Sequence, residues 1–136
     1  LSPSQASSLV RKASLYSIYS LATASQFGAF QALKIPKSTL SDRHLMALEA
    51  RDITVENLRV PSTYPYGGLY TFLDLSDWKK GSVDDFIRVC ISRGVSLAPG
   101  IAFGTRYTSY ARLCFTAVNT DMLRDGIAIV NDIYNN

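Results

Sequence analysis

The chain has 136 residues, a formal net charge of +3, 47% hydrophobic residues and 18% charged residues. This composition excludes a disordered chain and is typical of a globular protein with enough apolar material for a core. No apolar run approaches the ~20 residues that span a bilayer, the N-terminus lacks a signal-peptide core, and the arginines are dispersed rather than gathered in a basic run. We therefore expect no membrane insertion, no nucleic-acid binding and a cytoplasmic protein.

Two helices are predicted in the first 36 residues. The segment Ser2-Pro3-Ser4-Gln5 combines an N-cap serine, a proline at the first helical position and a glutamine at the capping-box position. Apolar residues then recur at helical spacing at positions 6, 9, 10 and 13. A second series, formed by Ile18, Leu21, Ala22 and Ser25, predicts another helix that ends before Pro36.

A third helix, a connector, a strand and a fourth helix are predicted next. The third helix runs from Ser38 or Ser41 to about Leu58, with a rough apolar stripe formed by Leu45, Leu48, Val55 and Leu58. A turn-rich connector over residues 61–68 leads to a strand over residues 69–75. Ser82-Val83-Asp84-Asp85 is typical of a capped helix start with acidic residues in the first turn, and that helix should end at Gly94.

The last segment predicts a strand, a tight loop, a second strand and a final helix. The strands are expected over residues 95–98 and 111–116, and Asn119-Thr120-Asp121 opens the helix. Pro99-Gly100 indicates a sharp turn, and Gly100 and Gly104 permit backbone conformations or close approaches that other residues do not. The expected fold class is α+β, with a sheet of a few strands covered by helices.

Arg112 is the charged residue that most needs an explanation, because it lies inside a predicted strand between Ala111 and Leu113. It is either a strand residue facing water or a guanidinium held in a cleft for an anionic group. The planar guanidinium offers two parallel hydrogen bonds to a carboxylate, which lysine cannot reproduce. Arg106 competes for such a role, but it lies in the polar loop of residues 105–109 and is expected to be solvated.

Three segments carry a resemblance to a known family. Residues 67–75 (Gly-Gly-Leu-Tyr-Thr-Phe-Leu-Asp-Leu), residues 94–104 with Pro-Gly and Phe-Gly, and residues 110–115 with Arg-Leu follow one another in that order before an amphipathic helix. This order resembles the C-terminal part of class I/II aminotransferases, which use pyridoxal 5'-phosphate (PLP). The resemblance continues more faintly through residues 31–33 and 50–58.

The resemblance implies a division of the chain and a site. Residues 1–36 would be the tail end of the large PLP-binding domain, residues 37–60 an interdomain helix, and residues 61–136 the C-terminal small domain. Arg112 occupies the family position for the substrate α-carboxylate, and Gly100 and Phe103 would lie near the substrate. The implied partners are an amino acid, a 2-oxo acid, the missing N-terminal part and a second subunit in a homodimer.

The cofactor lysine is missing from this pattern. A PLP catalyst needs a lysine Schiff base. The resemblance implies an arginine for the cofactor phosphate about eight positions after that lysine. From Lys12 that position is Ser20. A complete enzyme of this class is roughly three times longer than this chain, and residue 1 is leucine. We therefore expect a fragment that is inactive alone and contains no catalytic or cofactor-binding residue.

The remaining reactive residues suggest no second chemistry. Cys90 and Cys114 fit no zinc or redox spacing and are expected to be buried apolar residues. His44, the only histidine, is expected on a helix surface without metal or triad chemistry. Alternatives to the aminotransferase are a PLP lyase, cyclase or decarboxylase of the same fold, an aminotransferase-like effector domain of a transcription regulator, or a stand-alone binding or assembly module.

Overall fold

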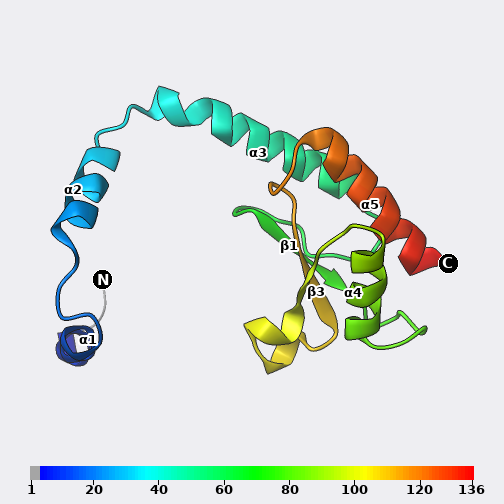
Figure 1. Cartoon of the computed structure of the whole chain (residues 1–136), viewed down its shortest axis with the longest axis horizontal. Helices are drawn as coiled ribbons and strands as arrows, with labels where there is room; N and C mark the ends of the chain where they lie inside the picture. The colour runs from blue at the N-terminus through cyan, green and yellow to red at the C-terminus, as the bar shows by residue number, and fades with distance from the viewer. Residues whose placement is uncertain (1–3) are drawn as a thin grey trace. The chain divides into compact units, whose positions relative to one another are not determined.

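The computed structural model describes residues 4–136, with the side chains from residue 6 onward (Figure 1). The chain divides into two compact units, Leu1–Leu40 and Ser41–Asn136. Helices α1 (Ser4–Ser17) and α2 (Thr23–Ala32) belong to the first unit, and α3 (Lys37–Asn57) begins there and continues into the second. None of the helices in residues 4–136 combines the length and the apolarity that a membrane span requires.

The first helix is confirmed as α1, and its predicted N-cap at Ser2 and Pro3 lies outside the described residues. The second helix begins later than predicted, because Ile18 and Leu21 lie in the connection before α2. Tyr19 there has a φ of 62°, and the Ser20 N–H donates to the Ile18 carbonyl at 2.8 Å. This tight turn interrupts the helical hydrogen-bond ladder, and apolar spacing carries no signal for such a break.

The second unit contains a three-stranded antiparallel sheet. The strands are β1 (Tyr70–Asp74), β2 (Ala98–Pro99) and β3 (Tyr110–Cys114), in the spatial order β1-β3-β2. Strand β3 lies in the middle and pairs with β1 along its whole length. The expected α+β fold, with a small sheet and helices, is confirmed.

The predicted strand over residues 95–98 is mostly wrong. Within that range only Ala98 pairs with β3. The other residue of β2, Pro99, lies just after the predicted range. The Val95 N–H donates to the Cys90 carbonyl at 2.9 Å, and Gly94 has a φ of 88°. These features belong to a helix end, where a glycine with positive φ reverses the chain. After β2 the chain forms two short 3-10 helices, η1 (Gly100–Phe103) and η2 (Thr105–Tyr107).

Both predicted caps in the second unit are confirmed. Ser82 caps α4 (Val83–Ser92): its side chain accepts from the Asp85 N–H, and the Asp85 carboxylate accepts from the Ser82 N–H at 2.9 Å. Asn119 caps α5 (Thr120–Asn135) by accepting from the Met122 N–H at 2.9 Å. The local sequence therefore defines where these two helices begin.

The core lies between one face of the sheet and helices α4 and α5. Leu73 and Ala111 of the sheet are fully buried with Phe86 of α4 and Val130 of α5. Helix α3 adds Ala50, Ile53 and Thr54. The stripe predicted for α3 is wrong for Leu45 and Val55, which are exposed. The sheet therefore has a covered face and an opposite face that these helices leave free.

Polar contacts fix the helices around this core. The Asn131 side chain of α5 donates to the Asn57 carbonyl at 2.9 Å and accepts from the Arg59 N–H at 2.7 Å. Arg93, after α4, pairs with Asp132 of α5 at 2.5 Å. These contacts hold the C-terminal end of α3 and the end of α4 against α5, which lie together in Figure 1.

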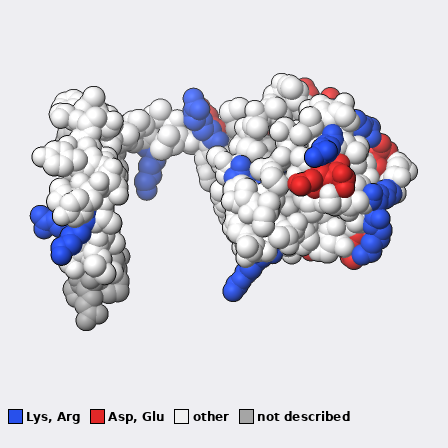
Figure 2. Space-filling view, turned by 60° about the horizontal axis from the view of Figure 1, so that its bottom comes forward, with Lys and Arg blue, Asp and Glu red and all other residues white. Residues whose placement is uncertain are grey.

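Charge is divided unevenly between the two units. All 11 acidic residues lie in residues 41–136. Blue and red side chains are interspersed on the face of that unit that Figure 2 shows. The charged residues of the first unit are Arg11, Lys12, Lys34 and Lys37.

Candidate functional site

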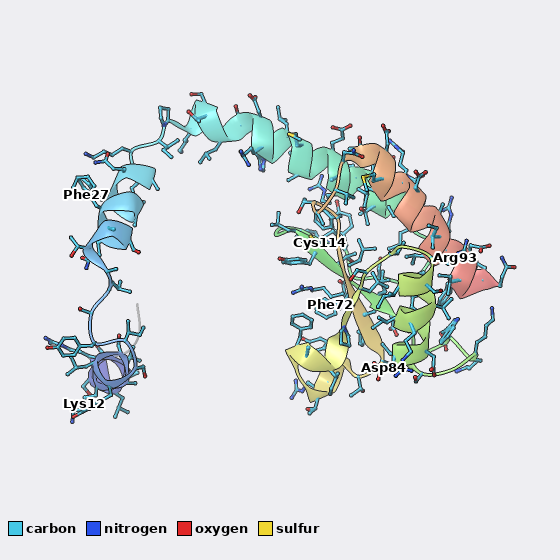
Figure 3. The ribbon with its side chains drawn as sticks, in the orientation of Figure 1. Lys12, Phe27, Phe72, Asp84, Arg93 and Cys114 are labelled. Carbon is cyan, nitrogen blue, oxygen red and sulfur yellow. The ribbon has the colours of Figure 1, made fainter. Side chains whose placement is uncertain are left out.

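Arg112 lies on the face of the sheet that α4 and α5 leave free. In β3, Ala111 and Leu113 are buried, whereas the alternate residues are only partly buried. The register places Phe72 of β1 directly opposite Arg112. We call the alternate residues of the two strands the open face, and Phe72 and Cys114 are labelled on it in Figure 3. The open face consists of Tyr70, Phe72, Asp74, Tyr110, Arg112 and Cys114.

Two aromatic rings lie against the Arg112 guanidinium. The Arg112 Cζ is 4.2 Å from the ring centroid of Tyr70 and 4.4 Å from that of Phe103. Tyr70 is the first residue of β1, and Phe103 is the last residue of η1. We call Tyr70 and Phe103 the aromatic clamp. Its rings favour the cation electrostatically.

Arg112 has no ion-pair partner among the side chains of residues 6–136. The ion pairs found there are Arg51–Asp52, Lys79–Asp77 and Arg93–Asp132. A partly buried guanidinium without a carboxylate partner can donate two charge-assisted hydrogen bonds to an external carboxylate. Both interpretations from the sequence, an anion site and a solvated strand residue, stay predictions.

An aromatic cluster surrounds this site. The Phe72 ring centroid lies 5.5 Å from that of Phe103, 5.3 Å from that of Tyr107 and 6.4 Å from that of Tyr110. Apolar rings lower the local dielectric, which strengthens the attraction between a guanidinium and an anion. The open face is therefore an aromatic surface with one cation in it.

Gly100 supports the loop that carries Phe103. The glycine is buried, and a Cβ at this position would lie 2.1 Å from the Tyr107 carbonyl oxygen and 2.5 Å from the Tyr110 carbonyl oxygen. No other residue fits this close approach of three backbone segments. The predicted need for glycine here is thus explained by packing, while its contact with substrate stays a prediction.

Asp74 and Tyr110 face each other at the other end of the open face. Hydrogen bonds from the Ser76 hydroxyl and the Ser76 N–H lower the pKa of Asp74. The charge of Asp74 in turn raises the pKa of Tyr110. At neutral pH the pair is therefore a carboxylate engaged by Ser76 beside a neutral tyrosine hydroxyl.

The two cysteines differ. Cys90 is fully buried, as predicted, and burial raises the pKa of its thiol to about 11. The prediction of a buried Cys114 is wrong, since Cys114 is only half-buried. Its position in β3 falls on the open face, a property that depends on the sheet and not on local composition.

The other candidate residues lie outside the open face. His44 is on α3 and exposed, as expected, and Arg106 is on η2 and exposed. Lys79 and Lys80 lie in the exposed turn before α4. Lys12 is an exposed residue of α1. Residues 4–136 contain no group of His, Cys, Asp or Glu that could hold a metal ion.

Two hollows of the second unit lie beside the sheet without Arg112 among their lining residues. A hollow of about 370 Å³ lies between α3 and the connection from β3 to α5, and Arg112 is not among its lining residues. Another hollow, of about 260 Å³, is lined by residues 94–97, by the end of β3 with the turn that follows it, and by α5. A ligand at Arg112 would need further walls to be enclosed.

No protein-family model and no curated protein sequence matches the chain. Its fold is that of solved aminotransferase structures. The chain aligns over 99% of its length with 36% of the α-aminoadipate aminotransferase of Thermus thermophilus, which was solved with N-(5'-phosphopyridoxyl)-L-leucine, at a TM-score of 0.81 and 17% identity.

Two further structures agree. The aspartate aminotransferase of Thermotoga maritima has a TM-score of 0.78 and 24% identity, with 100% of this chain and 35% of that chain covered. The aromatic aminotransferase of Pyrococcus horikoshii has a TM-score of 0.73 and 20% identity, with 91% and 34% covered. The chain thus spans about a third of the length of these structures. The expected resemblance to aminotransferases is confirmed at the level of the fold.

The sequence predicts Arg112 and Phe103 as candidate site residues but not the surroundings of the guanidinium. It places Tyr70 and Phe72 on a strand and Tyr107 in a polar loop, without a role for any of the three. In β1, residues 70, 72 and 74 alternate with buried residues. This alternation in the sequence indicates that the three side chains share one face of the sheet. The pairing of β1 with β3 was needed to bring Tyr70 to Arg112.

Proposed function

We propose that this chain is the C-terminal part of a PLP-dependent aminotransferase, in which Arg112 binds the α-carboxylate of the amino acid and 2-oxo acid substrates. The observation that carries the proposal is the guanidinium of Arg112, which lies on the open face without a carboxylate partner among residues 6–136. The aminotransferase fold of the chain supports this role for the Arg112 guanidinium.

The residues described here do not fit PLP itself. PLP enzymes hold the cofactor through a lysine, and no lysine of this chain lies on β1 or β3. We assign PLP binding to a part of the protein outside this chain, and we expect the chain alone to be inactive. Held by that part, PLP would supply an electron sink for negative charge at the substrate Cα.

Arg112 contributes binding and orientation. Its edge can donate two parallel hydrogen bonds to the substrate carboxylate, which fixes the direction of the bonds at the substrate Cα. An amino acid and a 2-oxo acid carry the same carboxylate, so one arginine serves both halves of a transamination. Arg112 neither takes nor gives a proton in this role, because its guanidinium stays charged.

The exposed apolar residues of the first unit support a parent protein over a stand-alone binding module. Leu9, Val10, Phe27 and Phe30 are each more than half exposed. Such apolar surface is typical of a face that another part of a protein covers. By resemblance, we propose that α1 and α2 pack on the large PLP-binding domain, and that the intact protein is a cytoplasmic homodimer.

Spectroscopy of the source protein tests the proposal. We expect a polypeptide about three times the mass of this chain that absorbs visible light through lysine-bound PLP. Addition of an amino acid should convert the cofactor to pyridoxamine phosphate, with one 2-oxo acid formed per cofactor. A lyase or decarboxylase would release its product without that conversion, and a transcription regulator would carry a DNA-binding segment upstream. A colourless 15 kDa protein would contradict the proposal.

A further inference from the structure

We propose that Tyr70 and Phe103, the aromatic clamp, are positioning residues that hold the Arg112 guanidinium in one plane, so that a substrate carboxylate can bind only at its edge. This inference rests on the proposed function of Arg112 and goes beyond it. It assigns to two aromatic side chains the orientation of the carboxylate and the strength with which the arginine binds it.

The geometry carries the inference. The ring centroids lie 4.2 Å and 4.4 Å from the Arg112 Cζ, so both rings are within cation–π range. A free arginine side chain has many rotamers, and ordering one on binding costs free energy. A guanidinium already held by two rings loses less freedom when a carboxylate binds, and its N–H donors stay in a fixed plane.

The clamp is itself held in place. The Phe103 ring meets the Phe72 ring edge to face, at 5.5 Å and 88°. Gly100, where a Cβ would clash with two backbone carbonyls, fixes the start of the η1 segment that carries Phe103. Tyr70 is paired with Cys114 at the end of β3. The two rings thus come from separate segments that are each anchored to β3 or its neighbours.

The exposure of both rings separates a positioning role from a core role. Tyr70 is 44% exposed and Phe103 is 40% exposed, whereas fully buried Phe86 and Phe115 form the core. Removal of either clamp ring should therefore leave the fold intact while it loosens Arg112. This difference makes the inference testable without loss of the folded protein.

The first test is the side-chain NMR spectrum of this 136-residue chain, in which the Arg112 Nε–Hε signal is assigned by its loss in Arg112→Lys. Two rings over the guanidinium should shift this signal away from those of the other arginines through their ring currents. Tyr70→Leu should move it toward them, and Tyr70→Phe, which keeps the ring, should not. Tyr64→Leu is the matched control, because Tyr64 is an exposed tyrosine that contacts Tyr66 instead. An unchanged signal in Tyr70→Leu would overturn the clamp.

The second test measures substrate binding in the intact, PLP-loaded protein. Tyr70→Leu and Phe103→Leu should each raise KM for the amino acid about fivefold with little change in kcat, as the loss of one cation–π contact implies. Tyr70→Phe, which keeps the ring, should have the same KM as the wild type. If Arg112→Lys impairs binding while both leucine variants match the wild type, the positioning role is wrong. If Arg112→Lys binds the amino acid like the wild type, the proposed function is wrong. The NMR experiment tests the contact between the rings and the guanidinium independently of that result.

Discussion

The two units of the chain have similar apolar content along their helices but bury it differently. None of the described side chains in residues 6–40 is buried, whereas the second unit encloses a core around Leu73, Phe86, Phe115 and Val130. Both units therefore contain helices, but only the second contains its own packing partners for them. Burial distinguishes a self-sufficient fold from helices that need another surface.

Removal of a phenylalanine side chain should separate the units most clearly. Phe115→Ala deletes a ring that is 1% exposed and should lower the free energy of unfolding by about 3–5 kcal/mol. Phe27→Ala removes a phenylalanine ring that is 64% exposed, and should change the free energy of unfolding by less than about 0.5 kcal/mol. Urea unfolding followed by the fluorescence of Trp78, the single tryptophan, measures the first effect, and urea unfolding followed by circular dichroism of the helices measures the second. Equal losses would mean that the first unit is also packed.

Glycine-to-alanine substitutions should have opposite signs in the two units. Gly100→Ala forces backbone atoms apart and should destabilise the second unit by about 1–3 kcal/mol. Gly28→Ala, in α2, meets no atom within 4 Å and should favour that helix by up to about 1 kcal/mol. Circular dichroism should show more helix in Gly28→Ala, and urea unfolding should show an unchanged second unit. A tolerated Gly100→Ala would contradict the close approach described for η1.

Helix caps sharpen the comparison further. Ser82→Ala removes the capping box of α4 and should cost about 1 kcal/mol. Helix α2 begins after Ala22 and has no side-chain cap, so Ala22→Ser should add helix content in the first unit. Thermal unfolding and circular dichroism measure the two effects. No change in Ser82→Ala would mean that the cap hydrogen bonds do not stabilise α4.

The smallest expected effect is a dependence of stability on pH that comes from the second unit alone. Hydrogen bonds from Ser82 lower the pKa of Asp85 in the folded state. A lowered folded pKa contributes stability that is complete above the unfolded value and is lost as pH falls through the folded value. Wild type should therefore lose more stability than Asp85→Asn between about pH 7 and about pH 2. Parallel pH profiles of the urea midpoints would contradict this account of the cap.

Local sequence signals predicted the helix starts at Ser82 and Asn119 and the strand position of Arg112. Helix caps and the side-chain alternation of a strand depend only on residues that are close in the sequence. They failed at Tyr19, where a positive φ breaks the helix, and at Val95, which closes a helix end and not a strand. The aromatic clamp was missed for a different reason. It depends on the register of β1 with β3 and on the path of η1, which no local pattern specifies.

Substitution of the two candidate arginines in the intact protein tests most directly whether Arg112 binds the substrate carboxylate. Single-turnover measurements of the amino-acid half-reaction should show Arg112→Lys binding the amino acid about 10- to 100-fold more weakly, with PLP affinity unchanged. Arg106→Lys, on the exposed η2 helix, should match the wild type. If Arg112→Lys bound the amino acid as tightly as the wild type, or if both variants lost the same affinity, Arg112 would not be the carboxylate-binding residue.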